Sequence, residues 1–319
     1  MRVEPLGHLV FFGTPDFALP TLRALCDVGQ LPVEVISQPS RPAGRGRHLQ
    51  NPPVVEWALS RGLQVAQPRD VRAPEFLERM AALEPSVAVV VAFGQIFPQA
   101  LLEIPTRGCI NLHASMLPLY RGAAPIQAAI IAGETSTGVT TMQMEEGLDS
   151  GPILLQQELA IGSRETAGEL SERLADVGAE LVVRTLERLE TGDIEVRRQV
   201  DADATMAPRL RKADGLLDWR QAAPRLFNRI RGVTPWPGAV TQLRNRPLKV
   251  LWGSVVDSAS PSPTSEPGTY LGLIDARMAV CCGEGTVLGV ERLQRPGRKP
   301  LEASQFLNGE PIEIGERFG

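Results

Sequence analysis

The stretch HLVFFGTPD, residues 8–16, decides the fold class of the chain. Residues 8–12 form a short apolar run typical of a buried strand, and this run ends at Gly13. The next three residues predict the start of a helix, with Thr14 as the N-cap, Pro15 at the first helical position and Asp16 in the first turn. A buried strand followed directly by a helix indicates an α/β protein.

Strand and helix patterns continue to alternate after this stretch. Further apolar runs rich in Val and Ile predict buried strands at residues 33–37, 87–92 and 109–112. Helical patterns lie at residues 17–28, 54–61 and 75–83, and two more helices at 123–132 and 167–189 have strand patterns at 138–144 and 153–160 between them. This alternation predicts a doubly wound, mostly parallel sheet.

The pattern changes after Asp193. A polar and charged segment follows, and we expect a linker over residues 193–212 between a domain of residues 1–192 and a second domain of residues 213–319. After one amphipathic helix near residues 222–230, the second domain carries short strand patterns separated by Gly, Pro or Ser clusters, at residues 239–243, 248–256, 268–274, 278–282 and 286–293. These patterns predict a smaller antiparallel β-barrel.

Composition places the chain among globular proteins. Its 319 residues exceed one ordinary core and favour two domains, and 43% of them are hydrophobic while 22% are charged. No signal-like segment opens the chain, and the longest apolar run, residues 87–93, is too short to cross a bilayer, so we expect a cytoplasmic protein without a membrane partner. The four cysteines form no C-x-x-C pair, and we expect free thiols.

The formal net charge of −4 is unevenly distributed along the chain. Residues 1–205 carry 17 Lys and Arg against 26 Asp and Glu, whereas residues 206–319 carry 16 against 11. The excess of basic residues in the second part suits a polyanionic partner, although so modest an excess is also found on ordinary solvated surfaces.

Asn111, His113 and Asp149 are the candidate catalytic residues. Asn111 and His113 alternate along the apolar run of residues 109–113, so an extended strand directs both side chains to the same face. Asp149 lies in the polar segment EEGLDSG of residues 145–151. An amide that donates to an oxyanion, an imidazole that moves a proton and a carboxylate that orients the imidazole are the groups that acyl transfer to an amine requires. Taken singly, each of these residues is more often structural.

The sequence offers neither a metal-ligand pattern nor a dinucleotide fingerprint. The three histidines are far apart, with no H-x-E or H-x-x-x-H spacing, so we expect no metal. Gly13 is not part of a G-x-G-x-x-G motif, which disfavours NAD.

The candidate catalytic residues resemble the motif of the folate-dependent formyltransferase family, which has Asn-x-His, then Ser-x-Leu-Pro, then a distant Asp-x-Gly turn. Here these are Asn111 with His113, residues 115–118, and Asp149 with Gly151. Stretches similar to the family members that formylate methionine on initiator tRNA run through nearly the whole chain, at residues 12–17, 38–47, 121–127, 138–144, 219, 230–231, 235–237 and 283–285.

The resemblance implies a fold, a reaction and a set of binding residues. The fold is a Rossmann-like formyltransferase domain followed by an oligonucleotide-binding-like (OB-like) barrel, in a monomer. The formyl donor is 10-formyltetrahydrofolate, the acceptor is the α-amine of methionyl initiator tRNA, and no metal takes part. Asn111 donates to the oxyanion, while His113, polarised by Asp149, is a second donor and proton carrier. The folate site is formed, partly by main-chain groups, around residues 145–149 and by Phe93, Gly94, Gln95, Ile96, Phe97, Ser115, Met116, Leu117 and Pro118.

A basic loop is the expected contact with the acceptor end of the tRNA. Residues 39–53 contain Arg41, Arg45 and Arg47 and no acidic residue, a composition also typical of a segment that is disordered without a ligand. By the resemblance this loop inserts beside the acceptor end, and Arg45 is the first candidate for that contact. Further basic residues are expected to meet phosphates: Arg209, Arg211, Lys212, Arg244, Arg246, Lys249, Arg295, Arg298 and Lys299.

Two other functions stay open on the sequence alone. A formyltransferase could act on a small amine, such as glycinamide ribonucleotide or an amino sugar nucleotide, but neither the basic loop nor the second domain is needed for such a substrate. A non-catalytic RNA-binding protein could retain an inactive α/β domain, but the intact set of Asn111, His113 and Asp149 counts against it.

Overall fold

The computed structural model of the chain describes residues 7–43, 48–257 and 265–319. The chain divides into two compact units. The first comprises Met1–Pro125, Ser136–Ala160 and Ser171–Ala207, and the second comprises Ile126–Thr135, Ile161–Leu170 and Pro208–Gly319. The division is not a single cut in the sequence, because two short segments from its first half belong to the second unit.

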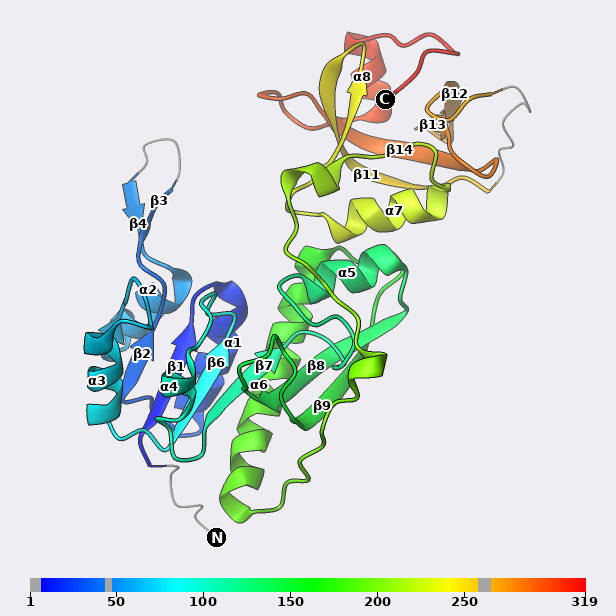
Figure 1. Cartoon of the computed structure of the whole chain (residues 1–319). Coiled ribbons are helices and arrows are strands. Elements are labelled where there is room, and N and C mark those ends of the chain that lie inside the picture. The colour runs from blue at the N-terminus through cyan, green and yellow to red at the C-terminus, as the bar shows by residue number, and fades with distance from the viewer. Residues whose placement is uncertain (1–6, 44–47, 258–264) are drawn as a thin grey trace. The chain divides into compact units, whose positions relative to one another are not determined.

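A seven-stranded sheet forms the centre of the first unit, in the order β5-β2-β1-β6-β7-β8-β9 (Figure 1). The strands are β1 (Leu9–Gly13), β2 (Glu34–Ile36), β5 (Val65–Ala66), β6 (Val87–Val91), β7 (Cys109–His113), β8 (Ser136–Gln143) and β9 (Ile153–Ala160). The first five strands of this order pair in parallel, and β8 and β9 add antiparallel pairs at one edge. The prediction of a mostly parallel α/β sheet is confirmed.

Helices follow most of these strands; all but the short α4, which the sequence did not predict, begin and end within one or two residues of the predicted ranges. They are α1 (Leu19–Asp27), α2 (Pro53–Ser60), α3 (Pro74–Ala82), α4 (Gln99–Leu102), α5 (Pro125–Ala132) and α6 (Ala167–Thr191), with short 3-10 helices η1 (Asp16–Ala18) and η2 (Asp201–Asp203). Among the helices that the structure describes, none combines the length and the apolar character that a membrane span requires.

Thr14 does not cap the first helix, so that prediction was wrong. The N-cap of η1 is Pro15, and neither η1 nor α1 has a side-chain cap. The Thr14 hydroxyl instead donates to the Phe93 carbonyl oxygen (3.0 Å) and accepts from the Gln38 N–H (3.3 Å). Threonine is favoured at N-caps because its hydroxyl can accept a hydrogen bond from a main-chain N–H group of the helix. Here the hydroxyl instead bonds to main-chain groups in the segments that follow two other strands. One side chain thus joins the segments that follow β1, β2 and β6.

Four phenylalanines form the core beside these strand ends. Phe12 on β1 packs edge-on against Phe76, Phe93 and Phe97, with ring centroids 4.9 to 6.5 Å apart. All four side chains are buried. Each edge-to-face pair adds about 0.5–1.5 kcal/mol beyond the burial of its rings. Two of these aromatic side chains therefore anchor the segment that follows β6.

The segment of residues 39–53, expected to be a loop, contains two short strands. β3 (Arg41–Ala43) and β4 (His48–Gln50) pair in antiparallel. The connecting residues 44–47 lie outside the described part of the chain. Sequence reasoning missed this pairing because Pro42 and the neighbouring glycines lower strand propensity.

An antiparallel sheet forms the second unit, in the order β10-β11-β14-β13-β12 with β15 paired to β14. The strands are β10 (Ala239–Leu243), β11 (Arg246–Val255), β12 (Tyr270–Ile274), β13 (Arg277–Cys281), β14 (Val287–Gln294) and β15 (Leu301–Glu302). The helices are η3 (Lys212–Gly215), α7 (Ala223–Gly232) and α8 (Ala303–Gly309). The prediction of a smaller antiparallel β-domain is confirmed.

The last residues of the chain close the gap between the two end strands of this sheet. Phe318 pairs with Leu243 on β10, and Arg317 pairs with Thr269 beside β12. Residues 315–319 therefore take the place of a strand, and the sheet closes into a small barrel.

Candidate active site

β7 positions the first two candidate catalytic residues. It lies between β6, which is parallel to it, and β8, which is antiparallel, with Asn111 opposite Val90 on one side and Met142 on the other. Asn111 and His113 are two residues apart in the strand, so their side chains leave the same face. Asn111 is half-buried, and among the described residues no group forms a hydrogen bond with its side chain. Its amide is available to a ligand.

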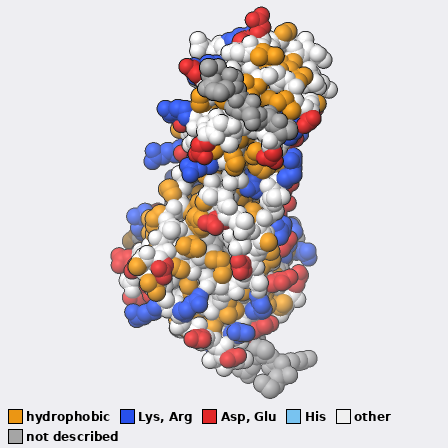
Figure 2. All heavy atoms as spheres, turned by 90° about the vertical axis from the view of Figure 1, so that its right-hand side faces the viewer, with side chains coloured by type: hydrophobic (Ala, Val, Ile, Leu, Met, Phe, Trp, Pro, Cys, Tyr) orange, Lys and Arg blue, Asp and Glu red, His pale blue; other side chains and the backbone are white. Residues whose placement is uncertain are grey.

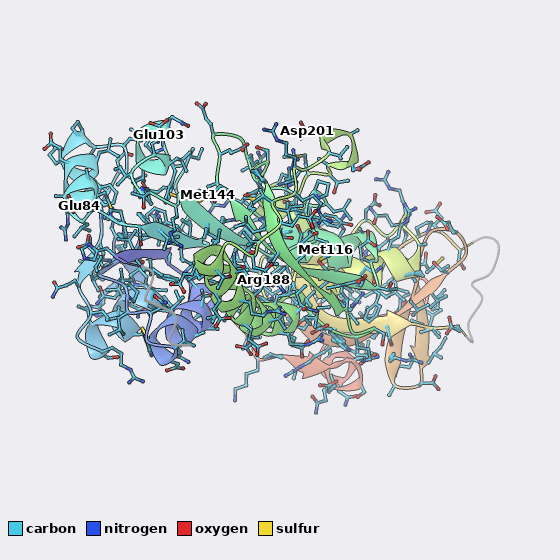
Figure 3. All side chains as sticks on the ribbon, turned by 90° about the horizontal axis from the view of Figure 1, so that it is seen from below. Glu84, Glu103, Met116, Met144, Arg188 and Asp201 are labelled. Atoms are coloured by element: carbon cyan, nitrogen blue, oxygen red, sulfur yellow. The ribbon has the colours of Figure 1, made fainter. Side chains whose placement is uncertain are left out.

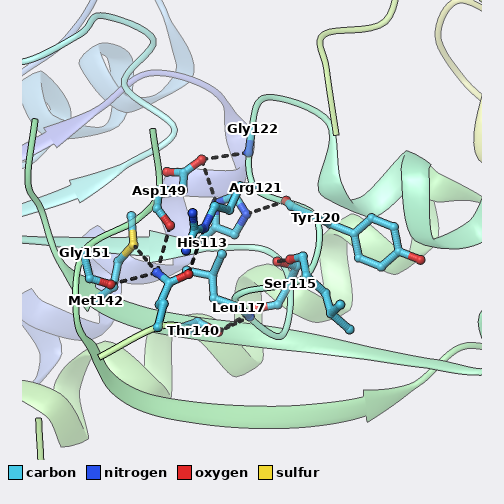
Figure 4. Close-up of polar contacts among 12 residues, drawn as sticks. His113, Ser115, Leu117, Tyr120, Arg121, Gly122, Thr140, Met142, Asp149 and Gly151 are labelled. Carbon is cyan, nitrogen blue, oxygen red and sulfur yellow. Dashed lines mark hydrogen bonds and ion pairs between the residues drawn. The ribbon is translucent and has the colours of Figure 1, made fainter. Parts of the chain in front are cut away.

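His113 lies between a carbonyl group and a carboxylate (Figure 4). Its imidazole is buried, and Nε2 lies 2.9 Å from the carbonyl oxygen of Tyr120. Because a carbonyl oxygen only accepts, Nε2 carries the proton in this contact. Nδ1 faces the Oδ2 atom of Asp149 at 3.7 Å, which is too long for a hydrogen bond but close enough for an ion pair when the ring is protonated.

Asp149 reaches His113 from the loop that follows β8. Its Oδ2 atom accepts a hydrogen bond from the Gly122 N–H (2.8 Å). Gly122 has a φ of +121°, and a Cβ atom there would lie 2.6 Å from the Ala207 carbonyl oxygen, so only glycine fits. Asp149 itself has a φ of +50°, in the left-handed region that residues other than glycine seldom adopt. Backbone strain of this kind is concentrated at functional sites.

Cys109 lies on the same strand but offers no nucleophile. Its thiol is buried, and burial raises the pKa of Cys109 to about 12. The thiolate is the reactive form, so this side chain is inert at neutral pH. All four cysteines of the chain are free, as expected.

The turn of residues 115–118 continues from β7, and two of its side chains point into the protein. The Ser115 hydroxyl donates to the Leu119 carbonyl oxygen (2.6 Å), and Leu117 packs against Met142 and Ile153. Met116 and Pro118 are half-buried. Of the four residues predicted to line the folate site, Ser115 and Leu117 therefore shape the turn, and Met116 and Pro118 keep exposed surface.

The segment of residues 93–97 presents its main chain rather than its aromatic rings. Phe93 and Phe97 are core residues, and Gln95 Oε1 accepts from the Val71 N–H (3.0 Å). Gly94 has a φ of +88° and is exposed, and Ile96 is 77% exposed. No main-chain N–H of residues 94–97 is hydrogen-bonded to another described residue. Open donors at this strand end are available to a polar ring.

Gln199 and Arg121 complete the site, and sequence reasoning missed both. Gln199 Nε2 donates to the carbonyl oxygens of Asp149 (2.8 Å) and Gly151 (2.7 Å), and Arg121 Nε donates to Gln199 Oε1 (2.9 Å). Arg121 lies in residues 121–127, a stretch that resembles the family but for which no catalytic or binding role was predicted. Gln199 lies in the segment expected to be a linker, and nothing in its composition marks it.

The predicted RNA-contacting arginines are only partly described. Arg41 is exposed on β3, where its Nη2 atom donates to Gln38 Oε1 (3.4 Å). Arg45 and Arg47 lie outside the described residues.

Comparison with known proteins decides the family. A family model described as "Formyl transferase" matches residues 8–186, and a second, "Formyl transferase, C-terminal domain", matches residues 209–311. A methionyl-tRNA formyltransferase of Geobacter metallireducens is 48% identical over 311 residues, which are 98% of both chains, and that of Trichlorobacter lovleyi is 47% identical over 97% of this chain and 96% of its own. The chain belongs to the methionyl-tRNA formyltransferase family.

Two solved structures with the same fold as this methionyl-tRNA formyltransferase family member are much more distant from it in sequence than the relatives named above. WlaRD, a sugar 3N-formyl transferase solved with dTDP and 5-N-formyl-THF, has a TM-score of 0.66 at 14% identity, over 92% of this chain and 99% of its own. HypX from Aquifex aeolicus in complex with tetrahydrofolic acid has a TM-score of 0.60 at 16% identity, over 98% of this chain and 50% of its own. At these identities the likeness establishes the fold alone.

The chemistry available to this formyltransferase family member is proton transfer and oxyanion stabilisation. In the described residues there is no group of three or more His, Cys, Asp and Glu side chains that could hold a metal ion. An amide, an imidazole and a carboxylate stand at the end of β7, and these groups suit acyl transfer.

Proposed function

We propose that the protein transfers the formyl group of 10-formyltetrahydrofolate to the α-amine of methionyl initiator tRNA. The observation that carries the proposal is that Asp149 lies close to His113 at the end of β7. Asn111 lies on the same face of this strand as His113. Family membership supports the choice of acceptor, since the relatives at 43–48% identity over nearly the whole chain are named methionyl-tRNA formyltransferase.

The proposed reaction forms one carbon–nitrogen bond and breaks another. The methionine amine attacks the formyl carbon, and the carbonyl electron pair moves onto oxygen. The Asn111 amide donates to that oxyanion. When the carbonyl re-forms, the bond to N10 of the folate breaks, the amine loses a proton and N10 gains one. His113, oriented by Asp149, handles the proton at Nε2. Its Nε2–H first donates to the oxyanion as the second donor, Nε2 then gives this proton to N10, and Nε2 takes up in return the proton that the amine loses.

The folate is proposed to bind beside β6 and β7. Main-chain groups of the segment Phe93–Phe97 recognise the polar edge of the pterin, which the open N–H groups of residues 94–97 support. Met116 and Pro118 cover the ring, and Ser115 and Leu117 hold their turn in place through its hydrogen bonds and packing.

The tRNA is proposed to contact basic groups of both units. In the first unit these are Arg41, Arg45 and Arg47, near the acceptor end. In the second unit a pocket of about 340 Å³ is lined by residues of α7, of the segment just before it and of the end of α5: Ile131, Ala132, Gln221, Arg225, Asn228 and Arg229. Among the described residues no carboxylate forms an ion pair with Arg225 or Arg229, although Arg229 Nη1 donates to the Asp214 carbonyl oxygen (3.0 Å). Both positive charges are therefore uncompensated and can attract a phosphate.

Two of the arginines expected to meet RNA are engaged within the second unit. Arg244 pairs with Glu316 (2.6 Å), and Arg295 pairs with Glu310 (2.5 Å). Their charges are already compensated, so they are weaker candidates for RNA contacts than the arginines of α7. On the face drawn in Figure 2, basic and acidic side chains are interspersed, and that face has no extended area of one sign.

An assay with defined acceptors tests the proposal. The purified protein is incubated with 10-formyltetrahydrofolate and, separately, methionyl initiator tRNA, the same tRNA without methionine, and glycinamide ribonucleotide. We expect formylmethionyl-tRNA from the first and no product from the other two. If the protein formylates glycinamide ribonucleotide but not methionyl-tRNA, the proposed acceptor is wrong and a formyltransferase of small amines is the favoured function.

A further inference from the structure

The loop that carries Asp149 is held in a conformation that it would not adopt alone. Asp149 has a φ of +50°. An aspartate tolerates the left-handed region better than most residues do, but it occupies that region only where the surroundings enforce it. The Gly122 N–H fixes one end of the residue by donating to Oδ2 (2.8 Å). This hydrogen bond holds only the side chain, so other contacts must hold the main chain of Asp149.

Gln199 holds that main chain with a single amide group. Its Nε2 atom donates to the Asp149 carbonyl oxygen at 2.8 Å and to the Gly151 carbonyl oxygen at 2.7 Å. Both N–H groups of the amide are therefore engaged, and the two carbonyl groups belong to the residues on either side of Ser150. The two carbonyls are forced to point toward the same atom, which defines the turn.

Arg121 fixes which way this amide faces. A guanidinium only donates, so the atom of Gln199 that lies 2.9 Å from Arg121 Nε must be the oxygen, and the nitrogen must face the loop. Arg121 is only 8% exposed, and its Nη2 atom donates to Asp201 Oδ1 at 2.9 Å. Its main chain also pairs with the segment after Gln199, through the Thr205 carbonyl oxygen (2.8 Å).

We propose that Gln199 is a positioning residue for the formyl-transfer reaction. It acts through the main chain of Asp149 and sets the distance between the carboxylate and the His113 imidazole. In the part of the chain that the structure describes, no hydrogen bond joins Gln199 to the His113 imidazole or to the Asp149 carboxylate, so its effect passes through the loop. This inference rests on the proposed function, because Asp149 must have a role in transfer for its position to matter.

A nearly isosteric substitution isolates the two donated hydrogen bonds. In Gln199→Glu the oxygen that accepts from Arg121 is kept, but both N–H donors are lost and a carboxylate faces the two carbonyl groups. We expect kcat for formyl transfer to fall about 10- to 100-fold, as small displacements of a catalytic group do, with KM for the tRNA unchanged. Gln157→Glu is the matched control, because this exposed glutamine of β9 is outside the network, and its kcat should stay at the wild-type value.

A double-mutant comparison separates positioning from general damage to the fold. If Gln199 acts through Asp149, then Asp149→Asn and the double variant Asp149→Asn/Gln199→Glu have the same kcat. Gln199→Met, which removes the donors without adding charge, replaces the glutamate variant in both measurements if that variant does not fold.

Two results would overturn the inference. One is a wild-type kcat in the variants at residue 199, and the other is a further loss when Gln199→Glu is added to Asp149→Asn. The proposed function fails separately, when the wild-type protein does not formylate methionyl-tRNA, and the comparison is then made with whichever amine the protein does formylate.

Discussion

Asn111 and His113 share a direction because a strand repeats every two residues, and this local rule is visible in the sequence. The approach of Asp149 to His113 depends in addition on the antiparallel pairing of β7 with β8, yet the motif still predicted the three residues as a set. Gln199 could not be predicted in this way. It contacts Asp149 across 50 residues of sequence, and a glutamine in a polar segment carries no signal of its own.

At the residue scale, the Asn111 side chain is expected to contribute strongly to the rate of formyl transfer. Asn111→Ala should lower the single-turnover rate of formyl transfer about 10²- to 10³-fold, because one oxyanion donor is lost while the fold of β7 stays intact. Rapid-quench measurement with saturating donor and methionyl-tRNA checks this. The control is Asn308→Ala on α8, an exposed amide, which should react at the wild-type rate. A near-normal rate for Asn111→Ala would remove this residue from its role.

At the scale of elements, hydrophobic periodicity predicted the long strands and helices, because each buries one continuous apolar run. The short elements were missed for the converse reason. β3, β4 and α8 are three to seven residues long and carry too few apolar positions to reveal a period. The role of Thr14 was also hidden, since its two partners come from segments 24 and 79 residues away.

Thr14 is expected to stabilise the carboxyl edge of the sheet. Thr14→Val should lower the free energy of unfolding by about 1–3 kcal/mol, because the Phe93 carbonyl and the Gln38 N–H lose their partner. Urea denaturation of both proteins measures the difference. Thr21→Val is a sharp control, since the buried Thr21 hydroxyl has no hydrogen-bond partner among the described residues and its removal should cost nothing. Equal losses in the two variants would contradict this account.

The closing segment of the barrel is expected to weaken in acid. Arg244 donates to both carboxylate oxygens of Glu316, and with the Glu313 N–H it lowers the pKa of Glu316 from an ordinary 4.5 to about 2. A depressed carboxylate pKa stabilises the folded state above pH 4.5, and this contribution is lost as the pH falls toward about 2.

Glu316→Gln removes this contribution at every pH. The melting temperature of wild type should therefore exceed that of Glu316→Gln at pH 7, and the two should converge as the pH falls from 4.5 to 2. Glu313→Gln is the control, and its difference from wild type should show no such convergence. A constant gap between wild type and Glu316→Gln across the acid range would refute the account.

For the whole molecule, composition predicted two units and a more basic second part, but it could not say which charges are free. Arg244 and Arg295 form ion pairs with carboxylates, whereas Arg225 and Arg229 of α7 form none with any residue that the structure describes. That distinction depends on which side chains the barrel brings together. From the sequence, only the number of charged residues is known.

The α7 arginines should govern part of the salt dependence of tRNA binding. In Arg225→Gln/Arg229→Gln we expect weaker binding of methionyl-tRNA and a plot of log K against log salt less steep by about 0.7–0.9 for each lost phosphate contact. Arg184→Gln/Arg188→Gln on α6 removes the same charge with the same spacing and is the matched control (Arg188 is labelled in Figure 3). Equal slopes in the two double variants would exclude a specific role for the α7 pocket.

The closure of the barrel by residues 315–319 has a consequence for handling the protein. If this segment is trimmed away by proteolysis, the outer edges of β10 and β12 lose the main-chain partners that now cover them. Bare sheet edges are templates for pairing between molecules. Trimmed preparations would then self-associate through these edges, and protease inhibitors during purification would be the remedy.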